Sequence, residues 1–259
     1  MTDHSGLLDR YRRLREVRFR LNNFLVTTIP KKTLEDCGRI LGFIQKGVLI
    51  FETEDESSLL MDYCIYYPET DGRNLVAKYL EKSPPPADSD ELIALQAMTH
   101  AYYSLFQIVG VERGVGVSVF DVLRDETGFI VDVGLGNTAQ RHMMLATRII
   151  PANGFLVTGG AGLPVDAAAA ERISGALKRS IFHPETFDFK RITPQQEAEI
   201  AALIIRACRS TGMTSRIAYA EPGSPAQRFT SGSGGRSDRR NVRCPCGSGK
   251  KYRACCGRR

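Results

Sequence analysis

Residues 106–135 read FQIVGVERGVGVSVFDVLRDETGFIVDVGL, with short strands expected at FQIVGVE, VGVSVFDVL and FIVDVGL. Residues 146–151 (ATRIIP) and 155–160 (FLVTGG) continue this Val- and Ile-rich composition. Gly114 and the run DETG at 125–128 supply the residues that hairpin turns require. Because no helical pattern separates these short segments, they predict a small antiparallel sheet or barrel rather than a parallel sheet.

The regions on both sides of this β-rich segment have a helical period. Apolar residues recur at helical spacing from Leu7 to Leu25, and Pro30 marks the end of that helix. The further helices that we expect cover residues 33–46 with Gly47 at the C′ position, 56–67, 73–82, 89–105, 166–180 opened by Asp166, and 193–212 opened by a capping box at Thr193-Pro194-Gln195-Gln196. The predicted fold class is therefore α+β, with a helical N-terminal region, a small antiparallel β-sheet or barrel, and C-terminal helices.

The chain has 259 residues and a formal net charge of +6, which is unevenly distributed. Residues 1–227 carry 25 basic and 28 acidic side chains, whereas residues 228–259 carry ten basic and one acidic. The overall composition excludes collagenous, wholly disordered and multi-span membrane classes. No run of 18 apolar residues is present and the N-terminus has no apolar signal region, so we expect a cytoplasmic protein without a membrane span.

Four of the seven cysteines gather in the tail sequence NVRCPCGSGKKYRACCGRR. Cys244, Cys246, Cys255 and Cys256 offer the soft sulfur ligands that tetrahedral Zn²⁺ prefers. So short a segment cannot build a core, and a metal ion would replace one. Four thiolates leave no open position for water, so the predicted cofactor is one structural zinc ion. Two disulfides are the alternative, which the adjacent cysteines and the absence of an export signal disfavour.

The stretch CPCGSGKKYRACCG at residues 244–257 resembles the SEC-C motif, the zinc-binding tail of the translocation ATPase SecA and of many otherwise unrelated bacterial proteins. The motif pattern CxCxSGxx[YF]xxC[CH] is met at every fixed position, including Ser248, Gly249 and Tyr252. The resemblance implies that the same four cysteines bind zinc, with Cys256 at a place where other members have His.

In SecA this motif docks protein partners such as the SecB chaperone and associates with ribosomes. The resemblance therefore implies a protein partner of the chaperone or translocation kind, or the ribosome, contacted through the basic zinc tail. The rest of the chain has no complete Walker A sequence and so is not SecA itself.

The predicted domains are an α+β body, a linker and the zinc motif. The body at 1–219 comprises a helical region (residues 1–105), a β-rich region (residues 106–165) and a second helical region (residues 166–219). Its stretch from ALQAM to FIVDV (residues 94–133) resembles uncharacterised bacterial SEC-C proteins, which brings no known activity. Ten of the 21 residues from Glu221 to Asn241 are Gly, Ser or Pro, so we expect a flexible linker at 220–241 before the zinc-binding motif at 242–259.

Two glycine-rich stretches resemble phosphate-binding loops only in some features. Residues 247–251 (GSGKK) lack the upstream Gly and the preceding strand of a phosphate loop, which favours a turn of the zinc site. Residues 158–162 (TGGAG) lack the spacing of a dinucleotide-binding turn, which favours a plain strand-to-helix connection.

Other polar residues give no pattern of a site, so we expect no catalytic and no cofactor-binding residue. The four histidines are far apart in the sequence: His4, His100, His142 and His183. The spacing of the three candidate carboxylates does not bring them together: Asp62, Asp121 and Asp132. Three cysteines lie on apolar helix faces, where small buried thiols are expected: Cys37, Cys64 and Cys208. The arginines near the start favour an amphipathic, solvated helix over a nucleic-acid-binding arm: Arg10, Arg12, Arg13, Arg15, Arg18 and Arg20.

The first functional hypothesis is a non-enzymatic zinc-binding adaptor, whose basic tail contacts an acidic surface of a protein or of ribosomal RNA. The alternative is an enzyme or ligand-binding protein with its site in the body and the zinc tail as an accessory. A deep pocket lined by His100, His142 or several carboxylates would favour this alternative.

Overall fold

Eight helices and eight strands make up the portion of the chain that the structure describes, residues 4–160 and 162–212 of a computed structural model. The helices are α1 (Ser5–Thr27), α2 (Lys31–Leu41), α3 (Glu54–Tyr66), α4 (Leu75–Lys82), α5 (Asp90–Thr99), α6 (Val133–Thr138), α7 (Ala167–Lys178) and α8 (Pro194–Arg209). The strands are β1 (Ile44–Gln45), β2 (Val48–Leu49), β3 (Tyr102–Glu112), β4 (Gly116–Asp121), β5 (Glu126–Val131), β6 (Met144–Ala152), β7 (Phe155–Thr158) and β8 (Leu163–Val165).

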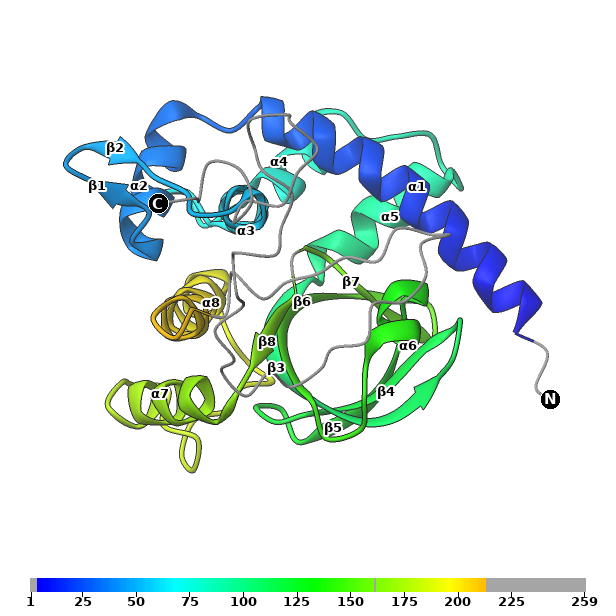
Figure 1. Cartoon of the computed structure of the whole chain (residues 1–259). Coiled ribbons are helices and arrows are strands. Elements are labelled where there is room, and N and C mark those ends of the chain that lie inside the picture. Colours follow the sequence, from blue (N-terminus) through cyan, green and yellow to red (C-terminus); the bar gives the residue numbers. More distant parts are fainter. Residues whose placement is uncertain (1–3, 161, 213–259) are drawn as a thin grey trace, which may run out of the picture. The chain divides into compact units, whose positions relative to one another are not determined.

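Five of these strands close a barrel in the order β3-β4-β5-β7-β6, with β6 pairing back to β3 (Figure 1). All pairings in the barrel are antiparallel except that of β5 with β7. β3 closes the ring because its first half pairs with β6 and its second half with β4, across an irregularity between Ile108 and Gly110. Along the chain, α6 lies between β5 and β6. The arrangement is that of a five-stranded Greek-key barrel of the OB kind. β8 pairs with the first residues of β6, on the edge opposite β3.

Alternating side chains fill the inside of the barrel. On β4, Val117 and Val119 are buried while Ser118 and Phe120 remain partly exposed, which is the period of two that a strand requires. One cluster of buried residues occupies the interior: Phe106, Ile108, Val117, Val119, Ile130, Ala139 and Ile149. The sheet or barrel predicted from the sequence is thus a barrel.

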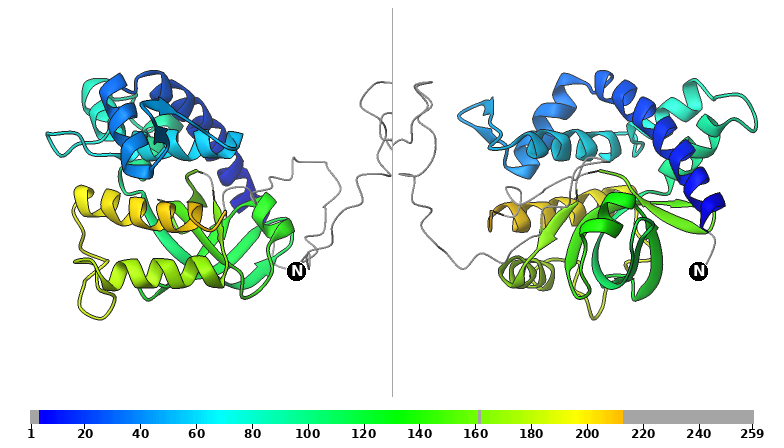
Figure 2. Two further views of the ribbon diagram at one scale, coloured as in Figure 1. Left: turned by 60° about the vertical axis from the view of Figure 1, so that its left-hand side comes forward. Right: turned by 45° about the vertical axis from the view of Figure 1, so that its right-hand side comes forward.

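The helices before β3 lie along one side of the barrel, with α5 between α1 and the strands (Figures 1 and 2). Leu21 of α1 and Met98 of α5 share an apolar cluster with Ile150 of β6 and Val157 of β7. Burial of these apolar faces against the strands stabilises the contact between the helices and the barrel, at roughly 25 cal/mol per Å² removed from water.

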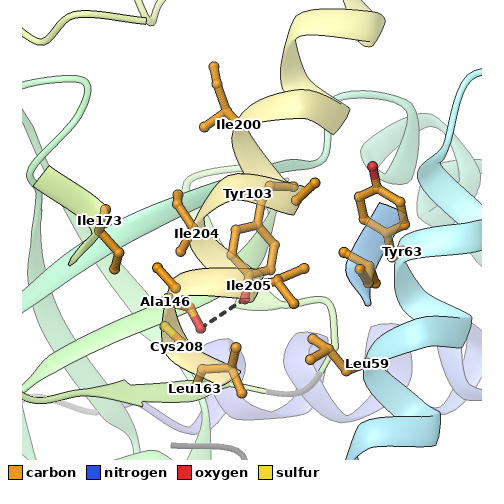
Figure 3. Packing of buried hydrophobic residues seen from close by; sticks show 14 of the residues in the cluster. Leu59, Tyr63, Tyr103, Ala146, Leu163, Ile173, Ile200, Ile204, Ile205 and Cys208 are labelled. Carbon is orange, nitrogen blue, oxygen red and sulfur yellow. Dashed lines mark hydrogen bonds between the residues drawn. The ribbon is translucent and has the colours of Figure 1, made fainter. Parts of the chain in front are cut away.

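A second cluster joins α2, α3, α7 and α8 to the barrel through β3, β6 and β8. Figure 3 shows Ile204 of α8 beside Tyr103 of β3, whose hydroxyl group donates to the backbone oxygen of Ala146 (3.4 Å). Tyr63 of α3 faces the same cluster and donates its hydroxyl hydrogen to the backbone oxygen of Ala198 (3.0 Å).

The predicted helix over 33–46 is wrong at both ends. The helix spans Lys31–Leu41, and Gly42 follows it with a left-handed φ of +77°, the conformation that commonly ends a helix. Gly47, which was expected at the end of the helix, instead has its positive φ in the turn between β1 and β2. The region over residues 1–105, expected to be helical, therefore also contains a short hairpin.

The predicted helix over 89–105 is too long. It ends at Thr99, and β3 begins at Tyr102, so strand structure starts before residue 106. The Tyr-Tyr-Ser-Leu sequence that follows favours a strand because its aromatic residues pack well on a pleated surface.

The predicted strand FIVDVGL is divided between two elements. β5 ends at Val131, and Asp132 caps α6 by accepting the backbone N–H of Leu135 (2.9 Å). An aspartate at this position favours a helix start because its carboxylate satisfies a free N–H group of the first turn.

Both predicted helix starts in the C-terminal half are confirmed. Asp166 accepts the backbone N–H of Ala169 (2.9 Å) at the start of α7. Thr193 and Gln196 form the expected capping box at the start of α8, with Pro194 as its first residue. No helix within residues 4–160 and 162–212 is long and apolar enough to cross a membrane.

Candidate functional site

A cleft of about 850 Å³ lies between α1, α5 and one end of the barrel. Its walls come from the first half of α1, from α5, and from the neighbouring ends of β5, β6 and β7. We call it the barrel-end cleft. Its volume lies in the range of sites that bind small organic ligands.

Arginine side chains of α1 form one rim of the barrel-end cleft. Arg10 and Arg13 both line it and both are exposed. The guanidinium of Arg10 donates to the backbone oxygen of Asn153 (2.7 Å) and lies 5.1 Å from the ring centre of Phe155. Arg10 is therefore held against the loop between β6 and β7, whereas Arg13 has no ion-pair partner among the described residues.

A buried carboxylate lies at the floor of the cleft, at the end of β4. One oxygen of Asp121 accepts hydrogen bonds from the Ser104 hydroxyl (2.6 Å) and from the backbone N–H groups of Leu123 and Arg124. The guanidinium of Arg124 stacks on the Tyr102 ring, 3.8 Å from its centre. Burial raises the pKa of Asp121 above its ordinary value and raises the pKa of Tyr102 to about 12.

A second polar group lies fully inside the protein, outside the cleft. Arg148 donates from Nε to Asp62 (3.0 Å) and from an amino group to Glu197 (2.7 Å), and its guanidinium lies 4.2 Å from the ring centre of Tyr66. Burial alone would lower the pKa of Arg148, but the two carboxylates outweigh it and raise that pKa. We call Asp62, Arg148 and Glu197 the buried ion triad, which connects α3, β6 and α8.

The glycines after β7 pass close to this triad. A Cβ atom at Gly160 would lie 2.6 Å from the Asp62 carboxyl group, and one at Gly159 would lie 3.1 Å from the Arg148 side chain. β8 follows, so residues 158–162 connect two strands and not a strand and a helix as expected. Close packing against the triad explains the need for glycine at these positions without a bound phosphate.

The four histidines do not form a site. His100 follows α5, is exposed and lines the barrel-end cleft, with Nδ1 2.9 Å from the backbone oxygen of Gln96. His142 lies in the exposed loop before β6. His4 pairs with Glu112 (2.9 Å), and His183 lies beyond α7. Among the described residues, no three His, Cys, Asp or Glu side chains are arranged to hold a metal ion.

The three candidate carboxylates also have separate partners, as expected. Asp62 pairs with Arg148, Asp121 lies near Ser104, and Asp132 accepts the hydroxyl hydrogen of Thr158 (2.8 Å). They therefore do not form a carboxylate cluster.

Cys37, Cys64 and Cys208 are buried free thiols, which confirms the expectation from the helix pattern. A hydrogen bond with Cys64, together with burial, raises the pKa of Cys37, and burial raises the pKa of Cys208 to about 12. The raised pKa holds the thiols of Cys37 and Cys208 in the protonated, unreactive form.

The amphipathic helix expected at the start is present as α1, but one of its arginines is not solvated. Arg18 is buried and donates to the backbone oxygen of Thr158 (2.7 Å) at the end of β7. Burial lowers its pKa. Its place on the apolar face, three residues before Leu21, was the available signal for this burial.

The predicted zinc ligands Cys244, Cys246, Cys255 and Cys256 lie outside the described residues. The same is true of the predicted linker at 220–241 and of the GSGKK turn at 247–251. Within the described residues, the candidate binding site is the barrel-end cleft.

Comparison with known families gives two matches. The SEC-C motif matches residues 240–258, and a family of unknown function, DUF7986, matches residues 5–185. Neither the comparison with curated proteins nor that with solved structures found a match. SEC-C is generally a zinc-binding motif, and the second match covers more than half of the chain and the whole barrel. The chain therefore belongs to the DUF7986 family and carries a SEC-C motif at residues 240–258.

Proposed function

We propose that this chain is a non-enzymatic, zinc-binding adaptor that contacts a partner through its SEC-C motif. One zinc ion would be held by Cys244, Cys246, Cys255 and Cys256. The match to the SEC-C motif over residues 240–258 is the observation that supports this proposal. Four thiolates suit zinc by their softness and fill a tetrahedral coordination sphere. The ion would order the motif when bound and would leave no open position for catalysis.

The partner surface would be acidic. Ten basic and one acidic side chain lie in residues 228–259, so a carboxylate-rich protein surface or ribosomal RNA has the complementary charge. The proposal places the protein in a reducing compartment such as the cytoplasm. The free thiols of Cys37, Cys64 and Cys208 agree with this placement.

Partner capture by the full chain tests this proposal. Zinc-loaded wild type should retain purified ribosomes or a specific protein, and Cys246→Ser should lose that partner while its body melts at the same temperature. Cys208→Ser is the matched control, because that thiol is buried in the body. Equal capture by Cys246→Ser and wild type would contradict the proposal. A steep loss of binding with salt would identify RNA, and a shallow loss a protein surface.

A second candidate function is ligand binding in the body, and the barrel-end cleft is the observation that favours it. His100, Asp90 and Glu126 line this cleft together with apolar side chains. The test is ligand-observed NMR of the full chain with mixtures of nucleotides, sugars, amino acids and short peptides. Gln96→Trp, which places a large ring at the lining, should abolish any binding, and Gln96→Ala should preserve it. Binding that is unaffected by Gln96→Trp would place the ligand elsewhere.

A further inference from the structure

The barrel has an incomplete seam between β5 and β7. These two strands pair at a single position, Ile130 with Leu156, although β5 begins four residues earlier, at Glu126. On its other side β5 pairs with β4 over its full length, from Glu126 to Val131. The first half of β5 therefore has a ladder of hydrogen bonds on one side only.

The pattern of hydrogen bonds shows which groups face this seam. The N–H of Asp132 donates to the backbone oxygen of Val115 (3.1 Å), so residue 132 is directed toward β4. Because bonding direction alternates along an antiparallel strand, the N–H and C=O groups of Thr127 and Phe129 point away from β4. Thr127 is exposed, and the register pairs no residue of β7 with it. It is an open strand edge.

The barrel-end cleft lies directly along this open edge. Thr127, Gly128 and Phe129 line it from β5, and Phe155 and Leu156 line it from β7. A Cβ atom at Gly128 would lie 2.7 Å from Leu156 Cδ1, so the leucine side chain packs against the strand where a side chain is missing. Leu156 thus covers one face of β5, and the register leaves the backbone edge at Thr127 without a partner in β7.

Apolar surface also lies on the opposite wall of the cleft. Leu14 of α1 and Ile93 of α5 line it, and Ile93 is 42% exposed. An open strand edge between apolar walls has the two properties that a surface needs to bind an extended peptide. The edge offers backbone hydrogen bonds, and the walls accept side chains at alternate positions.

The charges of the cleft point to the same class of ligand. Glu126 pairs with Lys190 (3.0 Å), and Asp121 lies 3.6 Å from Arg124. Asp90 is in the first turn of α5, where the helix dipole favours a carboxylate. Arg13 and Asp90 have no charged partner in the described portion of the chain, and Arg13 is the one of the two that can attract a carboxylate. Barrels of this kind often bind oligonucleotides, but the open edge of β5 offers backbone C=O as well as N–H groups, and a chain of phosphates has no donors for the C=O groups whereas a peptide backbone has.

We propose that the barrel-end cleft binds an extended peptide, which adds a strand to the open edge of β5 and places a carboxylate beside Arg13. The inference deepens the second candidate function and rests on it. At about 3.3 Å per residue, three or four peptide residues would span the open half of β5. The hydrogen bonds to Thr127 would supply register, and the apolar walls would select alternate side chains.

A selection from random ten-residue peptides, performed on the full chain, tests the proposal. Thr127→Pro removes the N–H at the open edge without removing a hydrogen bond to β4, and proline is tolerated in such edge positions. Thr127→Val keeps the N–H and the branched shape and is its matched control. We expect selected peptides to bind Thr127→Pro about tenfold more weakly than wild type, and Thr127→Val equally well.

N-methylation of the peptide supplies a second test that does not depend on the folding of any variant. Peptides methylated at alternate backbone nitrogens should lose binding for one set of positions and retain it for the other, because only one set faces β5. Arg13→Gln should weaken the binding of peptides that carry a carboxylate and leave the binding of their amide analogues unchanged.

Three results would overturn the proposal. Peptides that lose binding to Gln96→Trp but are insensitive to Thr127→Pro and to N-methylation would leave a ligand site in the cleft without strand addition. Peptides that bind Gln96→Trp as well as wild type would remove both the strand addition and the ligand-binding function of the cleft. Preferential binding of single-stranded RNA over every peptide would replace the proposed ligand with a different one.

Discussion

Replacing Arg148 by Met should destabilise the body strongly, because the change leaves Asp62 and Glu197 buried without a counter-ion. The Arg148 side chain is only 1% exposed, and the side chains of its two partners are 8% and 11% exposed. Removing one partner of a buried ion pair costs about 3–5 kcal/mol, and the lost contact with the Tyr66 ring adds about 1 kcal/mol. Methionine fills most of the vacated volume and so adds little cavity cost, and we expect a total loss of about 4–6 kcal/mol.

The assay is urea unfolding followed by far-UV circular dichroism, since the chain contains no tryptophan. For a body of this size the same loss in the free energy of unfolding corresponds to a decrease in the melting temperature of about 8–24 °C.

Arg39→Met is the matched control for Arg148→Met. Arg39 pairs with Asp36 (2.5 Å) on the exposed surface of α2, where water screens the pair and its loss should hardly change the free energy of unfolding. A loss below about 1 kcal/mol for Arg148→Met would refute the interpretation that the buried ion triad holds α3, β6 and α8 together.

Three further changes test other regions of the structure by the same unfolding assay. Gly160→Ala should cost about 1–3 kcal/mol, because its Cβ would lie 2.6 Å from the Asp62 carboxyl group. Gly6→Ala, in α1 with open space around it, should instead stabilise the chain by about 0.5–1 kcal/mol. Folding raises the pKa of Asp121, so its contribution to stability is complete below its ordinary pKa and is lost as the pH rises through the folded value. Asp121→Asn should flatten that portion of the stability–pH curve, and an unchanged curve would contradict the raised pKa.

Elements with a strong local signal could be predicted from the sequence. The capping box at Thr193, the Asp166 cap and the alternation on β4 depend on neighbouring residues, and the structure contains all three. The boundaries at Leu41 and Thr99 were missed because a helical pattern continues past them, while the backbone at Gly42 and the pairing of Tyr102 with Ile149 end the helices.

The ion triad and the open strand edge of the body depend on contacts between distant residues, which a single sequence does not show. Arg148 and Asp62 are 86 positions apart, and nothing in the composition around either one indicates a buried pair. The open edge of β5 results from its register with β7, and Thr127 is an ordinary strand residue in the sequence. By contrast, the SEC-C motif could be recognised because all its cysteines and glycines lie within residues 244–257.

The zinc content of the full chain tests the central claim most directly. Elemental analysis should give one zinc ion per chain for wild type and for the variant with Cys37, Cys64 and Cys208 replaced by Ala. Cys246→Ser should lose the zinc. Zinc retained by Cys246→Ser, or lost on replacement of the three body cysteines, would contradict a zinc site at Cys244, Cys246, Cys255 and Cys256.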